Sequence, residues 1–279
     1  MRVLTVAAKR LFPDFQSRLR VRRIINSPLD IIDTLTGRRD SLAPPRGLWF
    51  VGGRKKYETT NEQYLAFFSA SGLRPECSVL DIGCGIGVMA VRLTRFLTTG
   101  RYEGFDVVKV GTDWATAHIG ARFPNFRFTH ADMYNHHYNP QSSIPSETYS
   151  FQYPDDQFDF AFAKSVFTHM TPPGVKQYLH EAARVIKRGG TAIVSAFMIN
   201  QESAALIKAG KSSLALSPMD QYWTVDTEFP ETAIGLPETD FIEWCRSAGF
   251  QVKQIAYGSW CGRTQYLSYQ DIIALTCLK

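Results

Sequence analysis

The segment Val79–Gly87, with the sequence VLDIGCGIG, limits the possible folds more than any other feature of the chain. An apolar run ends near an aspartate, three glycines then alternate with other residues, and a helical stretch follows. Glycine lets the backbone approach a ligand closely, and the first N–H groups of a helix can bind a carboxylate. The segment therefore predicts a strand, a tight turn and a helix that together bind a small ligand.

Short runs rich in β-branched and aromatic residues alternate with helical stretches along most of the chain. The expected strands are residues 78–82, 102–107, 126–129, 158–162 and 191–197, followed by 251–257 and 271–278. The expected helices are residues 60–71, 86–97, 113–122, 174–187 and 238–248. This alternation indicates βαβ units around a parallel sheet, with the last two strands as an antiparallel closing pair. Gly189 and Gly190 are expected to end the fourth of these helices and to lead into the fifth strand.

The basic residues are concentrated at the start of the chain. Residues 1–46 hold ten Lys or Arg and four Asp, whereas the remaining residues hold 21 basic and 22 acidic side chains. We therefore expect a basic N-terminal extension, 1–46, of short helices that end at Pro44-Pro45, and one α/β domain, 47–279. The extension could pack on the domain, bind a membrane surface or a partner, or form a dimer contact. The nearly neutral domain argues against a nucleic-acid track.

The five cysteines are scattered and none has CxxC spacing, so we expect neither disulfides nor a metal site. The chain has no run of 18 apolar residues, and its first residues do not resemble a secretory signal. A cytoplasmic protein without a transmembrane segment is the expectation.

A dinucleotide-binding turn is the main alternative for the glycine segment. That turn has the pattern GxGxxG, with a small residue at the position where Val88 stands, and the spacing here is GxGxG. Asp106, at the end of the second expected strand, is placed to accept hydrogen bonds from the hydroxyls of a ribose. An acid in this position indicates that the ligand contains a nucleoside, but it does not identify the nucleoside.

Five phrases in order resemble the motifs of class I S-adenosylmethionine-dependent methyltransferases: VLDIGCGIG, YEGFDVV, FRFTHADMYN, FDFAFAKSVFTHM and RVIKRGGTAIVSAF. The match spans about residues 60–200. The phrases SWCGR and LSYQD also resemble a group of uncharacterised bacterial methyltransferases taken to act on small molecules. The resemblance implies a Rossmann-like, seven-stranded, mostly parallel sheet with an antiparallel final strand and helices on both faces. It implies S-adenosylmethionine as cofactor and S-adenosylhomocysteine as product.

The resemblance also implies which residues contact the cofactor. In this family the glycine loop faces the methionine part of the cofactor, the acid ending the second strand holds the ribose, the acid after the third contacts adenine, and the residues after the fourth lie near the sulfonium. The expected cofactor residues are Tyr57, Asp81, Gly83, Cys84, Gly85, Gly87, Asp106, Asp132, Met133, Lys164 and Ser165. For four of these residues a structural role without cofactor contact stays open: Tyr57 in a packed arm, Asp132 as a turn cap, Met133 in the core and Lys164 as a solvated charge.

His169 follows the fourth strand and is the candidate catalytic residue. A sulfonium is already a good methyl donor, so the enzyme mainly aligns the acceptor and removes a proton when the acceptor is a hydroxyl. A histidine titrates near neutral pH and suits that task. Similar enzymes place a histidine here either as the base or as a structural residue, and both readings are kept.

Two segments lack the βα rhythm and are expected to be lid or acceptor insertions: 133–157 and 199–237. His136 and His137 in the first segment are read as lid residues rather than metal ligands. Trp260 and Arg263 could line the acceptor pocket or belong to a hairpin. For Trp114, adenine stacking and ordinary packing are both open.

We expect transfer of a methyl group to a hydroxyl of a small molecule or glycan. No (D/N)PP(Y/F) tetrapeptide follows the fourth strand, where Ala163–Val166 stands, and this disfavours methylation of the amino groups of nucleic-acid bases. The alternatives are carbon or nitrogen methylation of a metabolite, and a regulatory module that binds the cofactor without catalysis. A homo-oligomer is possible.

Overall fold

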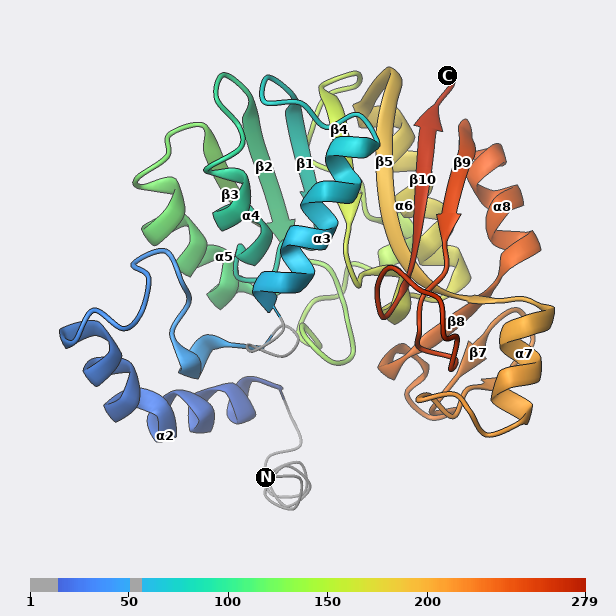
Figure 1. Cartoon of the computed structure of the whole chain (residues 1–279), viewed down its shortest axis with the longest axis horizontal. Helices are drawn as coiled ribbons and strands as arrows, with labels where there is room; N and C mark the ends of the chain where they lie inside the picture. Colours follow the sequence, from blue (N-terminus) through green and yellow to red (C-terminus); the bar gives the residue numbers. More distant parts are fainter. Residues whose placement is uncertain (1–14, 51–56) are drawn as a thin grey trace.

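The computed structural model describes residues 15–50 and 57–279, with the side chains of 57–59 left out. Its central sheet contains β1 (Ser78–Ile82), β2 (Arg101–Asp106), β3 (Phe126–His130), β4 (Phe158–Ala163), β5 (Ile186–Ile199), β9 (Phe250–Ala256) and β10 (Asp271–Cys277). The strands β3-β2-β1-β4-β5 are parallel, and β10 pairs antiparallel with β5 and β9 (Figure 1). The expected seven-stranded sheet with an antiparallel closing strand is confirmed.

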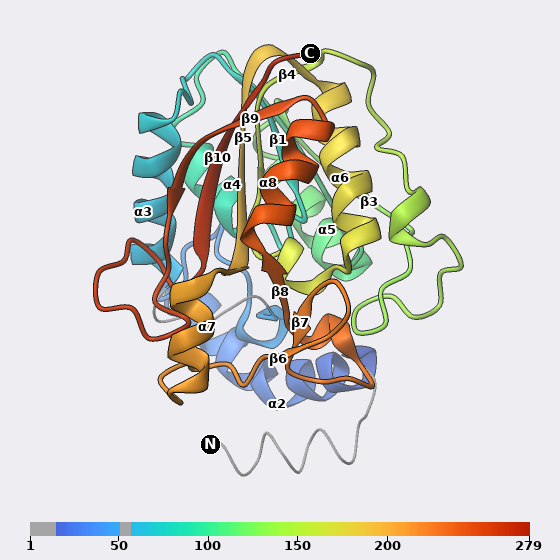
Figure 2. The ribbon, with the colours of Figure 1, turned by 90° about the vertical axis from the view of Figure 1, so that its right-hand side faces the viewer.

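Helices cover both faces of the sheet, as Figure 2 shows. One face carries α3 (Tyr57–Ala70), α4 (Val88–Leu93) and α5 (Lys109–Ala115), and the other carries α6 (Pro172–Val185) and α8 (Glu238–Ser247). The strand side chains alternate between two apolar cores: Phe160 and Phe162 pack on the first face, and Ala161 on the second. Because both faces are covered, the central strands read as continuous apolar runs.

The glycine pair before the fifth strand differs from the expectation. The helix ends at Val185, and β5 begins directly at Ile186, so Gly189 and Gly190 lie inside the strand. The pairing with β4 changes register at this point, and Gly189 has a φ of +80°. Residues 187–190 of β5 lie opposite Asp159 alone, and the left-handed Gly189 lets the backbone turn within this irregular stretch.

The insertion 199–237 adds three short strands to the sheet that the sequence did not indicate. It contains α7 (Gln201–Lys208), β6 (Ser217–Pro218), β7 (Trp223–Thr224), the short helix η5 (Pro230–Thr232) and β8 (Ile234–Pro237). β8 continues the sheet by pairing parallel with the far end of β5, and β7 pairs antiparallel with β8. The other insertion, 133–157, is mainly loop, with the short helix η3 (Ser146–Thr148).

Within residues 15–50, the N-terminal region forms one long helix and one short helix. α2 (Phe15–Leu35) continues through Pro28 and is followed by the short helix η1 (Arg46–Leu48). The Asp30 carboxylate accepts hydrogen bonds from the backbone N–H groups of Arg46 and Gly47, at 2.7 and 3.0 Å. In Figure 1, α2 lies beyond the carboxyl ends of the parallel strands.

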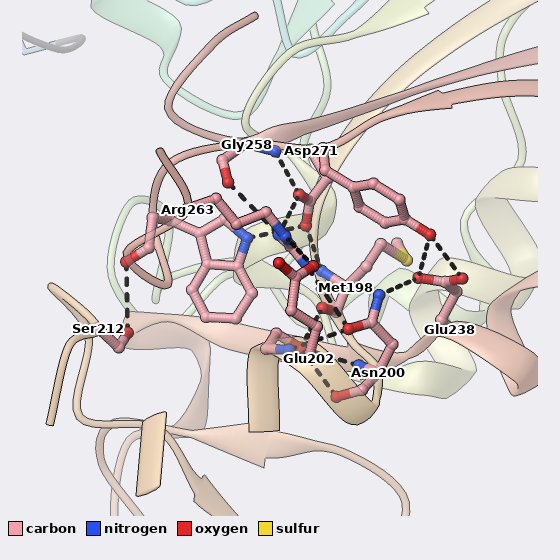
Figure 3. Close-up of polar contacts among 11 residues, drawn as sticks. Met198, Asn200, Glu202, Ser212, Glu238, Gly258, Arg263 and Asp271 are labelled. Carbon is pink, nitrogen blue, oxygen red and sulfur yellow. Dashed lines mark hydrogen bonds and ion pairs between the residues drawn. The ribbon is translucent and has the colours of Figure 1, made fainter. Parts of the chain in front are cut away.

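A buried polar network joins the start of β10 to the end of β5 (Figure 3). The fully buried Asp271 carboxylate accepts hydrogen bonds from the backbone N–H groups of Gly258 and Met198 and from the Trp260 indole, at 2.6, 2.7 and 2.8 Å. The Arg263 guanidinium lies 3.2 Å from the same carboxylate and 2.7 Å from Glu202. Trp260 and Arg263 are therefore part of a buried structural network that holds the last loop in place.

Asp271→Ala should lower the free energy of unfolding by about 3–5 kcal/mol, because it leaves the buried donors of Gly258, Met198 and Trp260 without an acceptor and takes one of two carboxylates from Arg263. Urea denaturation monitored by circular dichroism measures this loss. The matched control is Glu243→Ala, which breaks the exposed Arg246–Glu243 pair and should cost about 1 kcal/mol or less. Similar small losses for both variants would contradict the structural role of the network.

Candidate functional site

A cavity of about 530 Å³ lies at the carboxyl ends of the parallel strands. Its wall includes the turn after β1, the end of β2 and the residues that follow β4. The strand order reverses between β1 and β4, and in open α/β sheets ligands bind at such a reversal. The volume lies within the range of about 300–1,000 Å³ that is typical of small-molecule sites.

The glycine turn needs its glycines for two reasons. Gly83, Gly85 and Gly87 have φ angles of +81°, +59° and +75°, which other residues rarely adopt. A Cβ atom on Gly83 would also lie 2.4 Å from Cγ2 of Val166. The backbone N–H groups of Gly83 and Cys84 donate to the Phe105 carbonyl, at 2.9 and 3.0 Å, so the turn is bound to the end of β2.

Asp106 holds the same turn through its side chain. One carboxylate oxygen accepts the N–H of Gly85 at 2.7 Å, and the other accepts the N–H of Val108 at 2.8 Å. Burial raises the pKa of Asp106, and these backbone hydrogen bonds oppose the increase. Each carboxylate oxygen has a second lone pair, so Asp106 can accept two further hydrogen bonds from a ligand in the cavity.

Asp81 and Lys164 place opposite charges at the cavity wall. The buried Asp81 carboxylate accepts a hydrogen bond from the Tyr102 hydroxyl at 2.6 Å, and burial raises its pKa to about 7. The Lys164 ammonium donates to the Asn61 side chain at 2.7 Å and lies 4.6 Å from the centre of the Tyr64 ring. Burial lowers the pKa of Lys164 to about 8. Lys164 is thus held in the wall and is not a solvated loop charge.

The structure places the other expected cofactor residues in different surroundings. Cys84, Met133 and Ser165 line the cavity, whereas Gly87 and Asp132 are not part of its wall. Gly87 is the N-cap of α4, and the exposed Asp132 carboxylate accepts a hydrogen bond from Asn139 at 3.1 Å. The Tyr57 side chain lies outside the described residues, although α3 begins there.

Two aromatic candidates from the sequence lie away from the cavity. Trp114 stacks on the His118 ring with 4.6 Å between the ring centres, so ordinary packing accounts for it. Trp260 is fully buried in the network around Asp271. Neither tryptophan nor Arg263 belongs to the cavity wall.

His169 lies in the short helix η4 (Phe167–His169) and lines the cavity. Its Nδ1 atom lies 2.8 Å from the carbonyl oxygen of Glu231. A carbonyl only accepts hydrogen bonds, so Nδ1 carries the proton of the neutral ring and Nε2 carries the lone pair. Burial lowers the pKa of His169, and the backbone hydrogen bonds to Glu231 and Thr232 oppose this in part. The ring is therefore neutral near pH 7.

The cavity residues that were not candidates in the sequence include Asn61, Tyr138 and Gln270. Asn61 is fully buried on α3, but residues 58–63 are all polar, so no local signal distinguished it. The Gln270 side-chain oxygen accepts hydrogen bonds from the hydroxyls of Ser165 and Ser195, at 2.9 and 2.7 Å. The LSYQD phrase contains Gln270, but its partners lie 105 and 75 residues away, so the sequence did not indicate its place in the cavity wall.

The two insertions meet beside the cavity. The Glu231 carboxylate, from 199–237, accepts hydrogen bonds from the Asn135 side chain and the His136 backbone of the other insertion, both at 3.1 Å. The His136 ring stacks on Phe229 with 4.4 Å between the ring centres. Within residues 15–50 and 57–279, no group of three His, Cys, Asp or Glu side chains is arranged to hold a metal ion.

Residues 79–190 match a family model described as a methyltransferase domain. This segment, 112 of the 279 residues, is similar to methyltransferase domains. The fold of the chain is similar to solved structures of low sequence identity. A Methanosarcina mazei S-adenosylmethionine-dependent methyltransferase has a TM-score of 0.52 and 18% identity, over 76% of this chain and 97% of that one. An Aquifex aeolicus methyltransferase of the same type has a TM-score of 0.52 and 16% identity, over 81% and 100%.

A third similar structure is the PH0226 protein of Pyrococcus horikoshii, with a TM-score of 0.56 and 16% identity, over 82% of this chain and 94% of that one. At these identities the likeness concerns the fold. In the described part of the chain, no helix is both long and apolar enough to span a membrane.

Asp106→Ala should weaken the binding of S-adenosylmethionine about tenfold to hundredfold, because a hydrogen bond to a charged group contributes about 1.5–3 kcal/mol. Isothermal titration calorimetry measures the dissociation constant, and circular dichroism shows whether the turn still folds without its Gly85 contact. Asp113→Ala, which breaks an exposed ion pair with Lys109, is the control and should bind normally. An unchanged dissociation constant for Asp106→Ala would rule out its contact with the cofactor.

Proposed function

We propose that this chain transfers the methyl group of S-adenosylmethionine to a hydroxyl oxygen of a small molecule or glycan. The observation that carries the proposal is His169: its Nδ1 donates to the Glu231 carbonyl, and its ring lines the cavity. A neutral histidine with its lone pair on Nε2 is a base of suitable strength for a hydroxyl proton.

The proposed donor half of the cavity contains polar groups that fit the cofactor. Asp106 retains lone pairs for the two ribose hydroxyls, and Asp81 offers a carboxylate to the amino group of the methionine part. The Lys164 ammonium supplies the opposite charge for the cofactor carboxylate. Met133 and Phe105 form apolar wall that suits the adenine ring.

The cofactor supplies a methyl group bonded to a positively charged sulfur, and the sulfur keeps the electron pair when that bond breaks. The chain has to hold the acceptor oxygen in line with the methyl carbon and take its proton. In the proposed step, the acceptor oxygen forms a bond to the methyl carbon, and His169 Nε2 receives the hydroxyl proton. The Glu231 carbonyl keeps the ring in the required tautomer and orientation.

Lys164 is a weaker candidate for the base. With a pKa of about 8 it is mostly protonated at pH 7, and its ammonium donates to Asn61. A protonated amine has no lone pair to accept the hydroxyl proton. The arrangement favours His169 as the base and Lys164 as a partner for negative charge.

His169→Asn should lower turnover about 10²–10⁴-fold and leave the dissociation constant of S-adenosylmethionine unchanged. Asparagine retains a donor for the Glu231 carbonyl and removes the base. Release of S-adenosylhomocysteine, measured with a panel of phenols, polyols, sugars and amines, reports turnover. His180→Asn, at an exposed position of α6, is the matched control. Normal turnover of His169→Asn would exclude the base role, and methylation of amines alone would exclude hydroxyl transfer.

The pH dependence of kcat provides a separate check. Burial lowers the pKa of His169 below 6.5, so its basic form persists as the pH falls through 6.5. The wild-type enzyme should lose activity on the acid side with a midpoint below pH 6.5. His169→Asn should lack this limb in its residual activity, whereas a retained limb would assign the titration to another group.

A further inference from the structure

The outward face of α2 carries a group of exposed apolar side chains. They are Ile24, Ile25, Leu29, Ile31, Ile32 and Leu35, with exposed fractions from 46% to 81%. The described part of the chain exposes 14 large hydrophobic side chains, and six of them lie on this one helix. Their spacing places them on one side of the helix, so they form a continuous apolar surface. A surface of this kind in water usually marks an interaction site.

The opposite face of α2 fixes the helix to the body of the protein. Phe15 and Leu19 pack with Val108, and the Phe15 ring lies 5.6 Å from that of Phe50 and 5.2 Å from that of Tyr138. Phe50 and Tyr138 both line the cavity. The helix is thus anchored beside the cavity while its apolar surface faces away from the body.

The acidic side chains of α2 lie on the side that faces the body of the protein. Its two acidic residues, Asp30 and Asp33, point inward, where Asp30 accepts backbone N–H groups of η1 and Asp33 pairs with Arg46 at 2.7 Å. Arg20, four residues before Ile24, is exposed beside the apolar surface. Arg23 shares the side of Asp30, and its Cα lies 2.8 Å from where a Cβ atom on Gly47 would stand. Positive charge therefore borders the apolar surface at Arg20, and the acids of the helix are engaged elsewhere.

This combination distinguishes between two kinds of occupant. In a symmetric dimer the same surface meets itself, so the arginines of both copies would approach one another without acids between them. A bilayer containing anionic lipids offers both an apolar layer and negative charge at its surface. The charge pattern therefore favours a membrane surface over a second copy.

We propose that α2 lies in the surface of an anionic membrane, with its isoleucines and leucines inserted and Arg20 at the lipid headgroups. This contact is separate from the methyl-transfer chemistry proposed above. Because Phe15 of α2 packs on two residues of the cavity wall, membrane binding brings the cavity next to the bilayer.

The test is cosedimentation of the full chain with two kinds of vesicle, pure phosphatidylcholine and phosphatidylcholine with 30% phosphatidylglycerol as the anionic probe. The wild-type protein should bind the anionic vesicles at least about tenfold more tightly than the neutral ones, and salt should weaken this binding. Arg20→Gln should reduce binding about fivefold, and Ile24→Ser/Ile25→Ser should reduce it at least about tenfold.

Ile144→Ser/Tyr266→Ser is the matched control, because it removes two exposed hydrophobic side chains outside α2 and should bind vesicles like the wild type. Calorimetry with S-adenosylmethionine verifies that every variant is folded, whatever its turnover. Equal binding to both vesicles, or no effect of either α2 variant, would overturn the proposal. A wild-type dimer in sedimentation velocity that Ile24→Ser/Ile25→Ser dissociates, without vesicle binding, would assign the surface to a second copy instead.

Discussion

The attachment of the glycine turn to the end of β2 is the contact on which the site depends. The Phe105 carbonyl accepts the N–H groups of Gly83 and Cys84, and the Asp106 carboxylate accepts that of Gly85. These bonds hold the left-handed residues Gly83 and Gly85 in place at the end of β2. The ends of the adjacent parallel strands β1 and β2 therefore set the position of the cavity. This position coincides with the reversal of strand order.

Much of this architecture could be predicted because the signals are local. β1 and β4 are buried on both faces, so their sequences are short apolar runs, and the observed bounds agree with the expected ones within one residue. The glycines of the turn are required by their φ angles, which is also a local property. The irregular stretch at Gly189 shows where prediction from local signals fails. A glycine pair is equally suited to a helix end and to an irregular strand.

The features that escaped prediction depend on distant partners. β8 forms only because the end of β5 offers a free edge, and its four residues carry no independent strand signal. Lys164 lies in the cavity wall because its ammonium donates a hydrogen bond to Asn61, which lies 103 positions earlier in the chain. Gln270 likewise gains its place from Ser165 and Ser195. Asp132 has the position of a family motif, yet its side chain turns to Asn139 in this chain.

The contact between the two insertions at Glu231 has an evolutionary consequence. Asn135, His136 and His169 all meet this residue, whose segment lies far along the chain from the glycine turn. Changes in the length or composition of the insertions therefore leave the hydrogen bonds of the turn intact. Folds that separate a constant half from a variable half in this way can acquire new substrates without rebuilding the rest of the site. Divergence among relatives of this chain should accordingly concentrate in 133–157 and 199–237, while the strand ends stay alike.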